Sequence, residues 1–413
     1  MSRLSYFKTI LSCSFYGAFL ACLALNSFFW WLLTDISLSL PGGGDDQHRR
    51  MIPQTDYYDN HKEATQFKIQ QRKTQLPEWI TSYLQWHNET RQQLNEDNWQ
   101  DYKYLVSSCY HDDVQCGGLA DRLRTLPFLV QVAAMTGRIL LFSWERPYVL
   151  TEFLQPTGSI DWRLPSYVRV SRDDTHNPSS FVFNRVDHVE RIRESLDTVV
   201  SVHFQAYKEA EKYFDRYKVK PDDADMTQVL PLLWKLFFQP TPPIQQQIDS
   251  FYQRNHLTVS NYLAVHLRVL YDSASDTENL VESVRNALTC ASQFSSFSSV
   301  GMPIVVASDS QRVTDIAQQL APSHVVTTAA AALGNYSGPT IHLDRGSRFL
   351  EKPGALVIKE SSFPVEAYYA TFVDFYILMG AKCVAFDRGG FGRFASLLSA
   401  DPTCRSDHRH HKC

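Results

Sequence analysis

The strongest constraint on the fold of this chain is an alternation of apolar strand segments with helices, which occurs in two separate stretches. In the first stretch, strands are predicted over residues 102–108 and 138–144, with a helix over residues 119–137 between them. The second stretch repeats the pattern, with strands over 261–270, 302–308 and 382–386 and helices over 278–292, 311–320 and 365–381. Such units predict parallel sheets of the α/β class, with ligands at the carboxyl ends of the strands. We therefore predict two Rossmann-like domains facing a cleft and joined near the proline-rich residues 240–243.

An uncharged run over residues 9–34 lies between Lys8 and Asp35. As a helix rising about 1.5 Å per residue, it exceeds the roughly 30 Å hydrocarbon core of a bilayer. It is also longer than the apolar region of a cleaved signal peptide, about 7–15 residues. Arg3 and Lys8 precede it and acidic residues follow it, so the positive-inside rule places the N-terminus in the cytoplasm. We expect an uncleaved, single-pass type II anchor in the ER or Golgi membrane, with the rest of the chain in the lumen.

The predicted organisation has five parts. They are a cytoplasmic tail (1–8), a transmembrane anchor (9–34), a stem (35–98), an N-terminal Rossmann-like domain (99–243) and a C-terminal domain (244–413). Pro77 is expected to open a helix within the stem, which packs part of the stem on the folded body. The residues at helical spacing on that helix are Ile80, Tyr83, Leu84 and His87.

Cysteines and glycosylation triplets agree with a lumenal compartment. Two of the eight cysteines lie in the anchor, and the remaining six allow fifteen pairings. Cys109 and Cys116 bracket a short polar loop, so we predict a bridge between them, whereas Cys290 and Cys383 have buried thiols as the alternative. Possible glycan acceptors are Asn88 and Asn335. The formal net charge of -4 gives no whole-molecule bias towards nucleic acid, and no nucleic-acid partner is expected.

His266 and Arg268 end the first strand of the second stretch, and strand alternation points them to the same side. The planar guanidinium of an arginine suits a diphosphate, because it can make bidentate bonds to phosphate oxygens. The alternative is a structural ion pair with Asp272 or Asp276. A second strand ends in Ser308 and Asp309, where the alternative role of the pair is to cap the following helix.

A third candidate element runs from Asp374, in the predicted helix 365–381, to a loop after the last strand. That loop holds glycines at three of four positions, Gly389, Gly390 and Gly392. Glycines let backbone N–H groups approach an anion closely, although glycine-rich turns are common.

Together these elements resemble the GDP-fucose-dependent fucosyltransferases of the α1,6, protein-O- and nodulation types, which have the GT-B fold. The resemblance rests on VHLRVLYD, VVASDS and VDFYILMGAKCVAFDRGG in the second stretch and on CGGLADRLRTLPFLVQVAAMTGRILLF in the first, within residues 102–401. It implies metal-independent, inverting transfer of fucose from GDP-fucose to a hydroxyl of a glycan or glycoprotein, with no cofactor. The C-terminal domain would bind the nucleotide sugar and the N-terminal domain the acceptor.

Carried onto this chain, the resemblance implies that Arg268 binds the β-phosphate and stabilises departing GDP. His266 and Asp374 would face guanine, whose adjacent N1–H and N2–H₂ donors suit one carboxylate. Asp309 would support the strand that carries Arg268. The implied backbone contacts to the donor come from Gly117 and Gly118 in the first stretch and from Gly389 and Gly390, beside the side chain of Arg388.

The chain departs from the family pattern in two loops. It has Ala120, Asp121 and Arg122 where the family has amide side chains, and Gly389 and Gly390 where the family has serines. Ser361 and Ser362 mimic the missing serines but precede Asp374, and are interpreted as a helix-capping turn. Two alternatives therefore stay open. They are a catalytically silent lumenal protein that binds a nucleotide or glycan, and a transferase that uses another nucleotide sugar.

Three further groups of residues could carry chemistry. Asp223 and Asp225 match a D-x-D metal motif, but the polar segment before them favours a solvated helix turn. The histidines from His408 onward are interpreted as a flexible polar tail, with adventitious metal binding as the alternative. Glu145 follows a strand of the first stretch and is a candidate general base.

Overall fold

The structure is a computed structural model that describes residues 76–110, 116–170, 180–182, 187–203, 226–269, 277–294, 301–328, 343 and 364–410. The predicted anchor, Asn335, Asp223 and Asp225 lie outside these residues, as do Ser361 and Ser362. Within the described ranges, no helix combines the length and the hydrophobicity needed to cross a bilayer.

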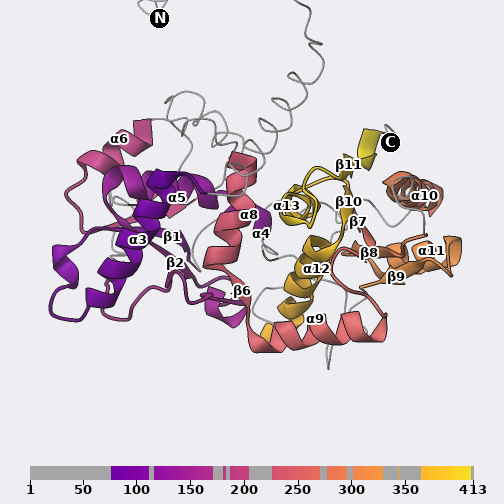
Figure 1. Ribbon diagram of the computed structural model, residues 1–413, viewed down its shortest axis with the longest axis horizontal. Coiled ribbons are helices and arrows are strands. Elements are labelled where there is room, and N and C mark those ends of the chain that lie inside the picture. Colours follow the sequence, from indigo (N-terminus) through magenta and orange to yellow (C-terminus); the bar gives the residue numbers. More distant parts are fainter. Residues whose placement is uncertain are drawn as a thin grey trace, which may run out of the picture. The chain divides into compact units, whose positions relative to one another are not determined.

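The first sheet has four parallel strands in the order β2-β1-β5-β4. They are β1 (Tyr104–Cys109), β2 (Ile139–Trp144), β4 (Ser180–Val182) and β5 (Val199–His203). β1 and β2 are buried along most of their length, which explains their apolar sequences. Figure 1 shows this sheet with α3 (Glu78–Gln93), α5 (Leu126–Thr136) and α6 (Asp187–Glu194) around it.

The helix predicted over residues 119–137 is interrupted. The chain instead forms α4 (Leu119–Leu123) and α5 (Leu126–Thr136). The reason is Pro127, which lacks an N–H and sits at the start of α5, where prolines are tolerated. α5 ends at Gly137, whose left-handed backbone (φ 61°) closes the helix before β2 begins.

Part of the predicted stem packs on this sheet, as expected. α3 (Glu78–Gln93) follows Pro77, and its four expected residues Ile80, Tyr83, Leu84 and His87 are buried. Tyr83 donates its hydroxyl to the backbone oxygen of Arg138 at 3.0 Å. His87 bonds the backbone oxygen of Leu140 through Nε2 at 2.9 Å. These buried bonds attach the helix to the start of β2.

The second sheet has five parallel strands in the order β11-β10-β7-β8-β9. The strands are β7 (Leu263–Leu267), β8 (Ile304–Ser308), β9 (Val325–Thr327), β10 (Cys383–Phe386) and β11 (Arg405–Asp407). From the central strand β7 the chain continues to β8 and β9 on one side, and later returns to β10 and β11 on the other. The carboxyl ends of β7 and β10 therefore form a topological switch point, where α/β sheets bind ligands.

Helices cover both faces of this sheet. α10 (Thr277–Phe294) and α11 (Gln311–Leu320) pack with one set of strand residues, including Val265 and Leu267. The alternate residue Ala264 belongs to the hydrophobic cluster of α12 (Tyr369–Gly380) and α13 (Gly390–Leu398). A 3₁₀ turn, Val365–Tyr368, precedes α12 and accounts for the first turn of the helix expected from the sequence. Because side chains alternate along a strand, His266 lies on the same face of the sheet as Ala264, the face covered by α12 and α13.

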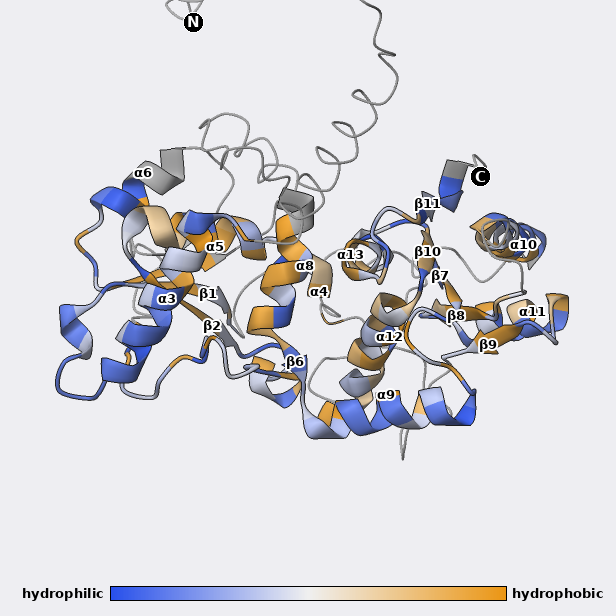
Figure 2. Cartoon of the chain, viewed as in Figure 1, coloured by the Kyte–Doolittle hydropathy of each residue, from blue (hydrophilic) through white to orange (hydrophobic). Residues whose placement is uncertain are grey.

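The two sheets share one hydrophobic cluster. α8 (Met226–Phe237) contacts both α5 and α13, and Figure 2 shows α8 as largely hydrophobic. Trp234 of α8 packs against Phe375 and Phe394 with ring centroids 5.4 Å away in each case. The proline-rich segment is ordered: a short pair of β3 (Leu154–Gln155) and β6 (Gln239–Pro240) leads into α9 (Pro242–Arg254), which contacts α12. Mixed α/β architecture with two parallel sheets is therefore confirmed.

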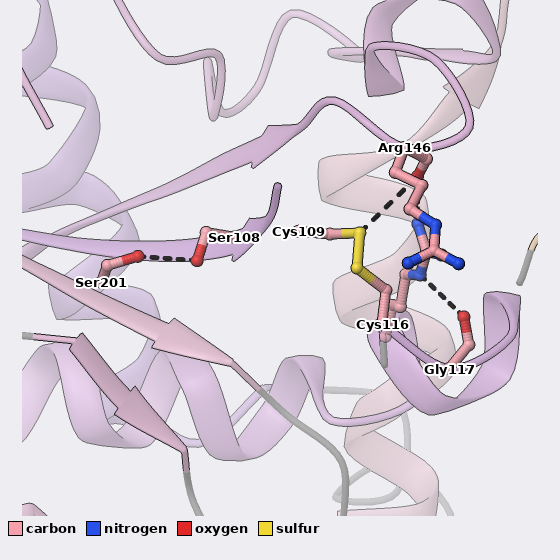
Figure 3. Close-up of a disulfide and its surroundings, with 7 residues drawn as sticks. Ser108, Cys109, Cys116, Gly117, Arg146 and Ser201 are labelled. Carbon is pink, nitrogen blue, oxygen red and sulfur yellow. Dashed lines mark hydrogen bonds between the residues drawn. A yellow bond between two sulfur atoms is a disulfide. The ribbon is translucent and has the colours of Figure 1, made fainter. Parts of the chain in front are cut away.

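Five cysteines in the described part of the chain are disulfide-bonded: Cys109, Cys116, Cys290, Cys383 and Cys404. The predicted Cys109–Cys116 bridge is present and joins the end of β1 to the loop before α4 (Figure 3). A second bridge joins Cys383 of β10 to Cys404, and Cys290 is also disulfide-bonded. The alternative that Cys290 or Cys383 remains a buried thiol is therefore wrong, because apolar surroundings accommodate a disulfide as readily as a thiol.

Candidate functional site

One pocket at the switch point collects residues from both sheets. It encloses about 580 Å³, part of it open to solvent. Six of the nine predicted site residues line it, namely Gly118, His266, Arg268, Asp309, Asp374 and Gly390. The other lining residues are Leu119, Ala120, Asp121, Ser308, Leu343, Thr371 and Phe391. Residues separated by up to about 270 positions in sequence thus meet because the carboxyl end of β7 faces the loop before α4.

His266 and Arg268 both reach the pocket, as strand alternation predicts. His266 is the fourth residue of β7 and only 6% exposed, whereas Arg268 follows the strand and is partly exposed. The imidazole packs beside Phe391, with ring centroids 5.2 Å apart. A partly exposed guanidinium at a strand end is suited to an anionic ligand that enters from solvent.

Two carboxylates hold the backbone at the end of β7. Arg268 N–H donates to Asp387 Oδ2 at 3.0 Å, and the next N–H, that of Val269, donates to Asp309 Oδ1 at 3.0 Å. Asp387 follows β10 and Asp309 follows β8, the strands on either side of β7. Asp309 therefore does not act as the helix cap considered above: the N-cap of α11 is Ser310. Consecutive bonds from both neighbours fix the direction in which Arg268 leaves the strand.

α12 supplies a second polar surface. Thr371 and Asp374 are three residues apart, which places them on the same helix face, and both line the pocket. Asp374 is 2% exposed and Thr371 is 4% exposed. Leu343 and Phe391 add apolar walls. A deep carboxylate with apolar neighbours can accept two adjacent N–H donors from a planar ligand.

The loop after β10 approaches Arg268 closely. Gly389 has φ 93° and precedes α13, and a Cβ at this position would lie 2.8 Å from Arg268 Nη1. A Cβ on Gly390 would lie 2.9 Å from Cβ of Ala120, so the two halves of the pocket touch here. Glycine is needed at both positions for this close approach. Arg388, by contrast, is exposed and is not among the lining residues.

The loop of the first half is braced by residues that depart from the family pattern. Gly117 has φ 71°, and Gly118 N–H donates to Asp121 Oδ2 at 2.9 Å. Arg122 is buried and donates through Nε to the backbone oxygen of Gly117 (2.9 Å) and through Nη1 to that of Arg146 (2.6 Å). Figure 3 shows Gly117 and Arg146 beside the Cys109–Cys116 bridge. The side chains at positions 121 and 122 thus give the loop a fixed shape.

Arg122 is also held by an aromatic ring, because its guanidinium lies 4.7 Å from the ring centroid of Trp144 at the end of β2. This contact links the glycine loop to a second strand of the first sheet.

Burial perturbs two titratable groups at the switch point. Burial lowers the pKa of His266 to about 3, and the positive charges of Arg268 and His408 act in the same direction. Burial likewise raises the pKa of Asp387 to about 7, and Asp309 adds to the rise while the Arg268 N–H opposes it. Although His266 Nδ1 lies 3.7 Å from Asp387 Oδ1, the imidazole is neutral near pH 7, so the pair is not a salt bridge.

Sequence reasoning missed several of these residues. Thr371 was detectable, since it stands one helical turn before Asp374. Asp387 was visible in the loop after β10, but nothing in a linear pattern shows that its carboxylate turns back to β7. Leu343 lies far from every motif in sequence and gave no signal.

The C-terminal segment is ordered as far as His410, and the expectation of a flexible tail from His408 onward is wrong for this part. β11 pairs with β10, and His408 is 5% exposed with its Nε2 3.3 Å from the backbone oxygen of His266. Arg409 also pairs with Asp407. Glu145 follows β2 and does not line the pocket. Among the residues that the structure describes, no group of three or more His, Cys, Asp or Glu side chains has metal-site geometry.

Comparison with known proteins gives similarities in structure alone. No protein-family model matches the chain, and no curated protein matches it. NodZ α-1,6-fucosyltransferase soaked with GDP-fucose is 18% identical over 72% of this chain and 93% of its own, with a TM-score of 0.39. A fucosyltransferase NodZ structure from Bradyrhizobium has the same identity and coverage, with a TM-score of 0.38. A mutant of Arabidopsis thaliana FUT1 in complex with GDP is 12% identical over 78% of this chain and 76% of its own, with a TM-score of 0.47.

These solved structures are fucosyltransferases, the class that the sequence motifs resemble.

α13 packs against the imidazole of His266, so a side chain added at Gly392 should destabilise the protein. Alanine is normally favoured over glycine in a helix by about 0.5–1 kcal/mol. Here a Cβ would lie 2.7 Å from His266 Nδ1 and 2.9 Å from two carbons of the same side chain. Gly392→Ala should therefore lower the free energy of unfolding by about 1–3 kcal/mol, measured by denaturant titration. Gly301→Ala is the control, because a Cβ there meets nothing within 4 Å. Equal stability of the two variants would contradict the packing.

Proposed function

We propose that this protein is a fucosyltransferase of the GT-B type that transfers fucose from GDP-fucose to a hydroxyl of a glycan or glycoprotein. The observation that carries the proposal is the convergence of Arg268, Asp374 and two glycine loops on one pocket. A phosphate-binding cation, a carboxylate for a base edge and close backbone approaches are the three elements that a nucleoside diphosphate sugar requires.

In the proposed complex the diphosphate lies against Arg268. Gly389 permits this arrangement, since any larger residue would displace the guanidinium. The backbone N–H groups at the start of α13 supply further donors, and a helix N-terminus favours an anion. Asp374 accepts N1–H and N2–H₂ of guanine, which uracil cannot offer as a pair. The donor is thus held at both ends, with the sugar facing the loop that contains Gly117 and Gly118.

The reaction breaks the bond between the sugar carbon and the β-phosphate oxygen and forms a bond from that carbon to the acceptor oxygen. Attack opposite to the leaving group inverts the sugar carbon. Negative charge grows on GDP in the transition state, and Arg268 is preorganised by Asp387 and Asp309 to stabilise it without a metal ion. The acceptor hydroxyl loses its proton. Asp121 is the lining carboxylate that the first half contributes, and it replaces Glu145 as our candidate base.

Two variants separate the role of Arg268 at the diphosphate of GDP from the role of Asp374 at its guanine. Arg268→Lys keeps the charge but loses the planar fork, so transfer should fall by about 2–4 kcal/mol of transition-state stabilisation, and GDP binding should weaken. Asp374→Asn should weaken GDP binding while the weaker binding of UDP barely changes, because an amide presents a donor towards guanine N1–H. Titration calorimetry with GDP and UDP, together with a donor-hydrolysis assay on a panel of nucleotide sugars, measures both effects.

The same measurements distinguish the alternatives. Unaltered GDP binding in both variants, with unchanged thermal melting, would place the nucleotide elsewhere and contradict the proposal. Hydrolysis of a different nucleotide sugar would identify another donor. GDP binding that depends on both residues without any donor turnover would indicate a catalytically silent binding protein, the reading favoured by the absence of the family's serines at Gly389 and Gly390.

We also propose that residues 9–34 anchor the chain in the ER or Golgi membrane with the enzyme in the lumen. Disulfides at Cys109–Cys116 and Cys383–Cys404 support an oxidising compartment. The glycans and glycoproteins proposed as acceptors are also found in the lumen of these compartments.

Protease protection in sealed microsomes tests this topology. The body should resist protease until detergent opens the vesicles, and the mature N-terminus should still precede the apolar run. A mature N-terminus that begins after about residue 30 would show a cleaved signal peptide instead. Glycan on Asn88 would add support, although Asn88 is half-buried within α3 and Thr90 is buried.

A further inference from the structure

Two buried polar atoms face each other behind the pocket. His266 Nδ1 and Asp387 Oδ1 are 3.7 Å apart, and the two side chains are 8% and 9% exposed. Neither atom has a hydrogen-bond partner within the described part of the chain. Leaving a buried polar atom unsatisfied costs about 1–3 kcal/mol, so an arrangement that satisfies both atoms at once is favoured. One proton placed between them does so once the two atoms, 3.7 Å apart here, approach to hydrogen-bond distance.

The position of that proton decides whether His266 presents a hydrogen-bond donor or an acceptor to the pocket. With Asp387 ionised, the neutral imidazole carries its proton on Nδ1 and donates it to the carboxylate, which leaves Nε2 as an acceptor. With Asp387 protonated, the carboxyl O–H donates to Nδ1, and Nε2–H becomes a donor. The Nδ1 edge of the ring is covered by Asp387 and Gly392, so the Nε2 edge is the one that faces the pocket.

We propose that His266 and Asp387 form a one-proton switch, through which binding of a nucleoside diphosphate takes up a proton from solvent. The proposal rests on the function proposed above, which assigns such a nucleotide to this pocket. Phosphate oxygens only accept hydrogen bonds, as do O6 and N7 of guanine, whereas the guanine donors are assigned to Asp374. A phosphate oxygen, or O6 or N7 of guanine, can therefore bond His266 only in the form in which Asp387 is protonated, whereas a ribose hydroxyl could donate or accept. We assign one of these acceptor atoms to His266.

The charged groups around Asp387 place this switch in an accessible pH range. β7 presents His266, Arg268 follows that strand, and the turn after β8 presents Asp309. The segment after β11 presents Arg409 to Asp387 and His408 to His266. Burial and Asp309 raise the pKa of Asp387 to about 7, against the effects of Arg268 and Arg409.

The pKa of His266, lowered to about 3, keeps the imidazole neutral over the same range. Asp387 is thus the group of the pair that titrates near neutrality. A bound diphosphate brings more negative charge and raises the Asp387 pKa further. Nucleotide affinity should consequently fall as pH rises through about 7, since the competent, protonated form becomes scarce.

Titration calorimetry measures how many protons the protein takes up when GDP binds. The purified full chain is titrated with GDP at about pH 6 and pH 8 in buffers of different ionisation enthalpy. The wild type should take up almost no proton at pH 6 and close to one at pH 8. Its affinity for GDP should fall about tenfold between these values, the loss expected when the competent form drops to about one molecule in eleven.

Asp387→Asn mimics the protonated state. Its amide oxygen can still accept the Arg268 N–H, while its NH₂ donates towards His266 Nδ1. This variant should bind GDP about tenfold more tightly than the wild type at pH 8 and equally at pH 6, with about one proton less taken up at pH 8. GDP itself also titrates in this pH range. The test is therefore the difference in proton uptake and in GDP affinity between the wild type and Asp387→Asn. Asp315→Asn, on the exposed side of α11, is the matched control and should behave like the wild type.

Equal proton uptake by the wild type and Asp387→Asn would overturn the proposal, as would a variant that melts normally but loses GDP affinity at both pH values. Nitrogen-15 shifts of the His266 ring give a test that needs no variant. In the empty protein the ring proton should move from Nε2 at pH 6 to Nδ1 at pH 8, and GDP should return it to Nε2. One unchanged tautomer would refute the switch, whereas failure of GDP to bind at all would instead refute the proposed function.

Discussion

The pocket depends on how the end of β7 is held. Two consecutive backbone N–H groups, those of Arg268 and Val269, donate to carboxylates that follow β10 and β8. Both neighbouring strands therefore determine where the Arg268 side chain begins. Carboxylates are costly to bury, and the raised pKa of Asp387 shows that cost. A cluster of this kind is more typical of a functional site than of a core that only needs stability.

The first half contributes a rigid edge to the same pocket. The Cys109–Cys116 bridge and the bonds of Arg122 hold the loop of Gly117 and Gly118 against β1 and β2. Gly390 touches Ala120, so small residues on both sides let the two loops meet. Side chains that looked like departures from the fucosyltransferase pattern are therefore accounted for by the shape of the loop. Substitution of glycines for serines is accounted for in the same way, by the approach of Gly389 to Arg268.

Local patterns predicted much of this arrangement. Strand periodicity identified β1, β2, β7, β8 and β10, and it correctly placed His266 and Arg268 on one side. Local patterns could not predict the features that depend on contacts between distant parts of the chain. The interruption between α4 and α5 follows from Pro127 and was readable in hindsight, but the burial of His408 depends on β11 pairing with β10. The contact of Asp387 with His266 likewise joins two strands about 120 residues apart, which no spacing rule reveals.

A crystal structure of the protein with GDP would show directly whether the nucleotide binds at the end of β7. The diphosphate should lie within hydrogen-bond distance of the Arg268 guanidinium and the backbone at Gly389 and Gly390, with guanine N1 and N2 facing Asp374. His266 Nε2 should lie within the same distance of an acceptor atom of the ligand. GDP bound away from the end of β7, or bound there with its base turned away from Asp374, would contradict the proposed nucleotide site.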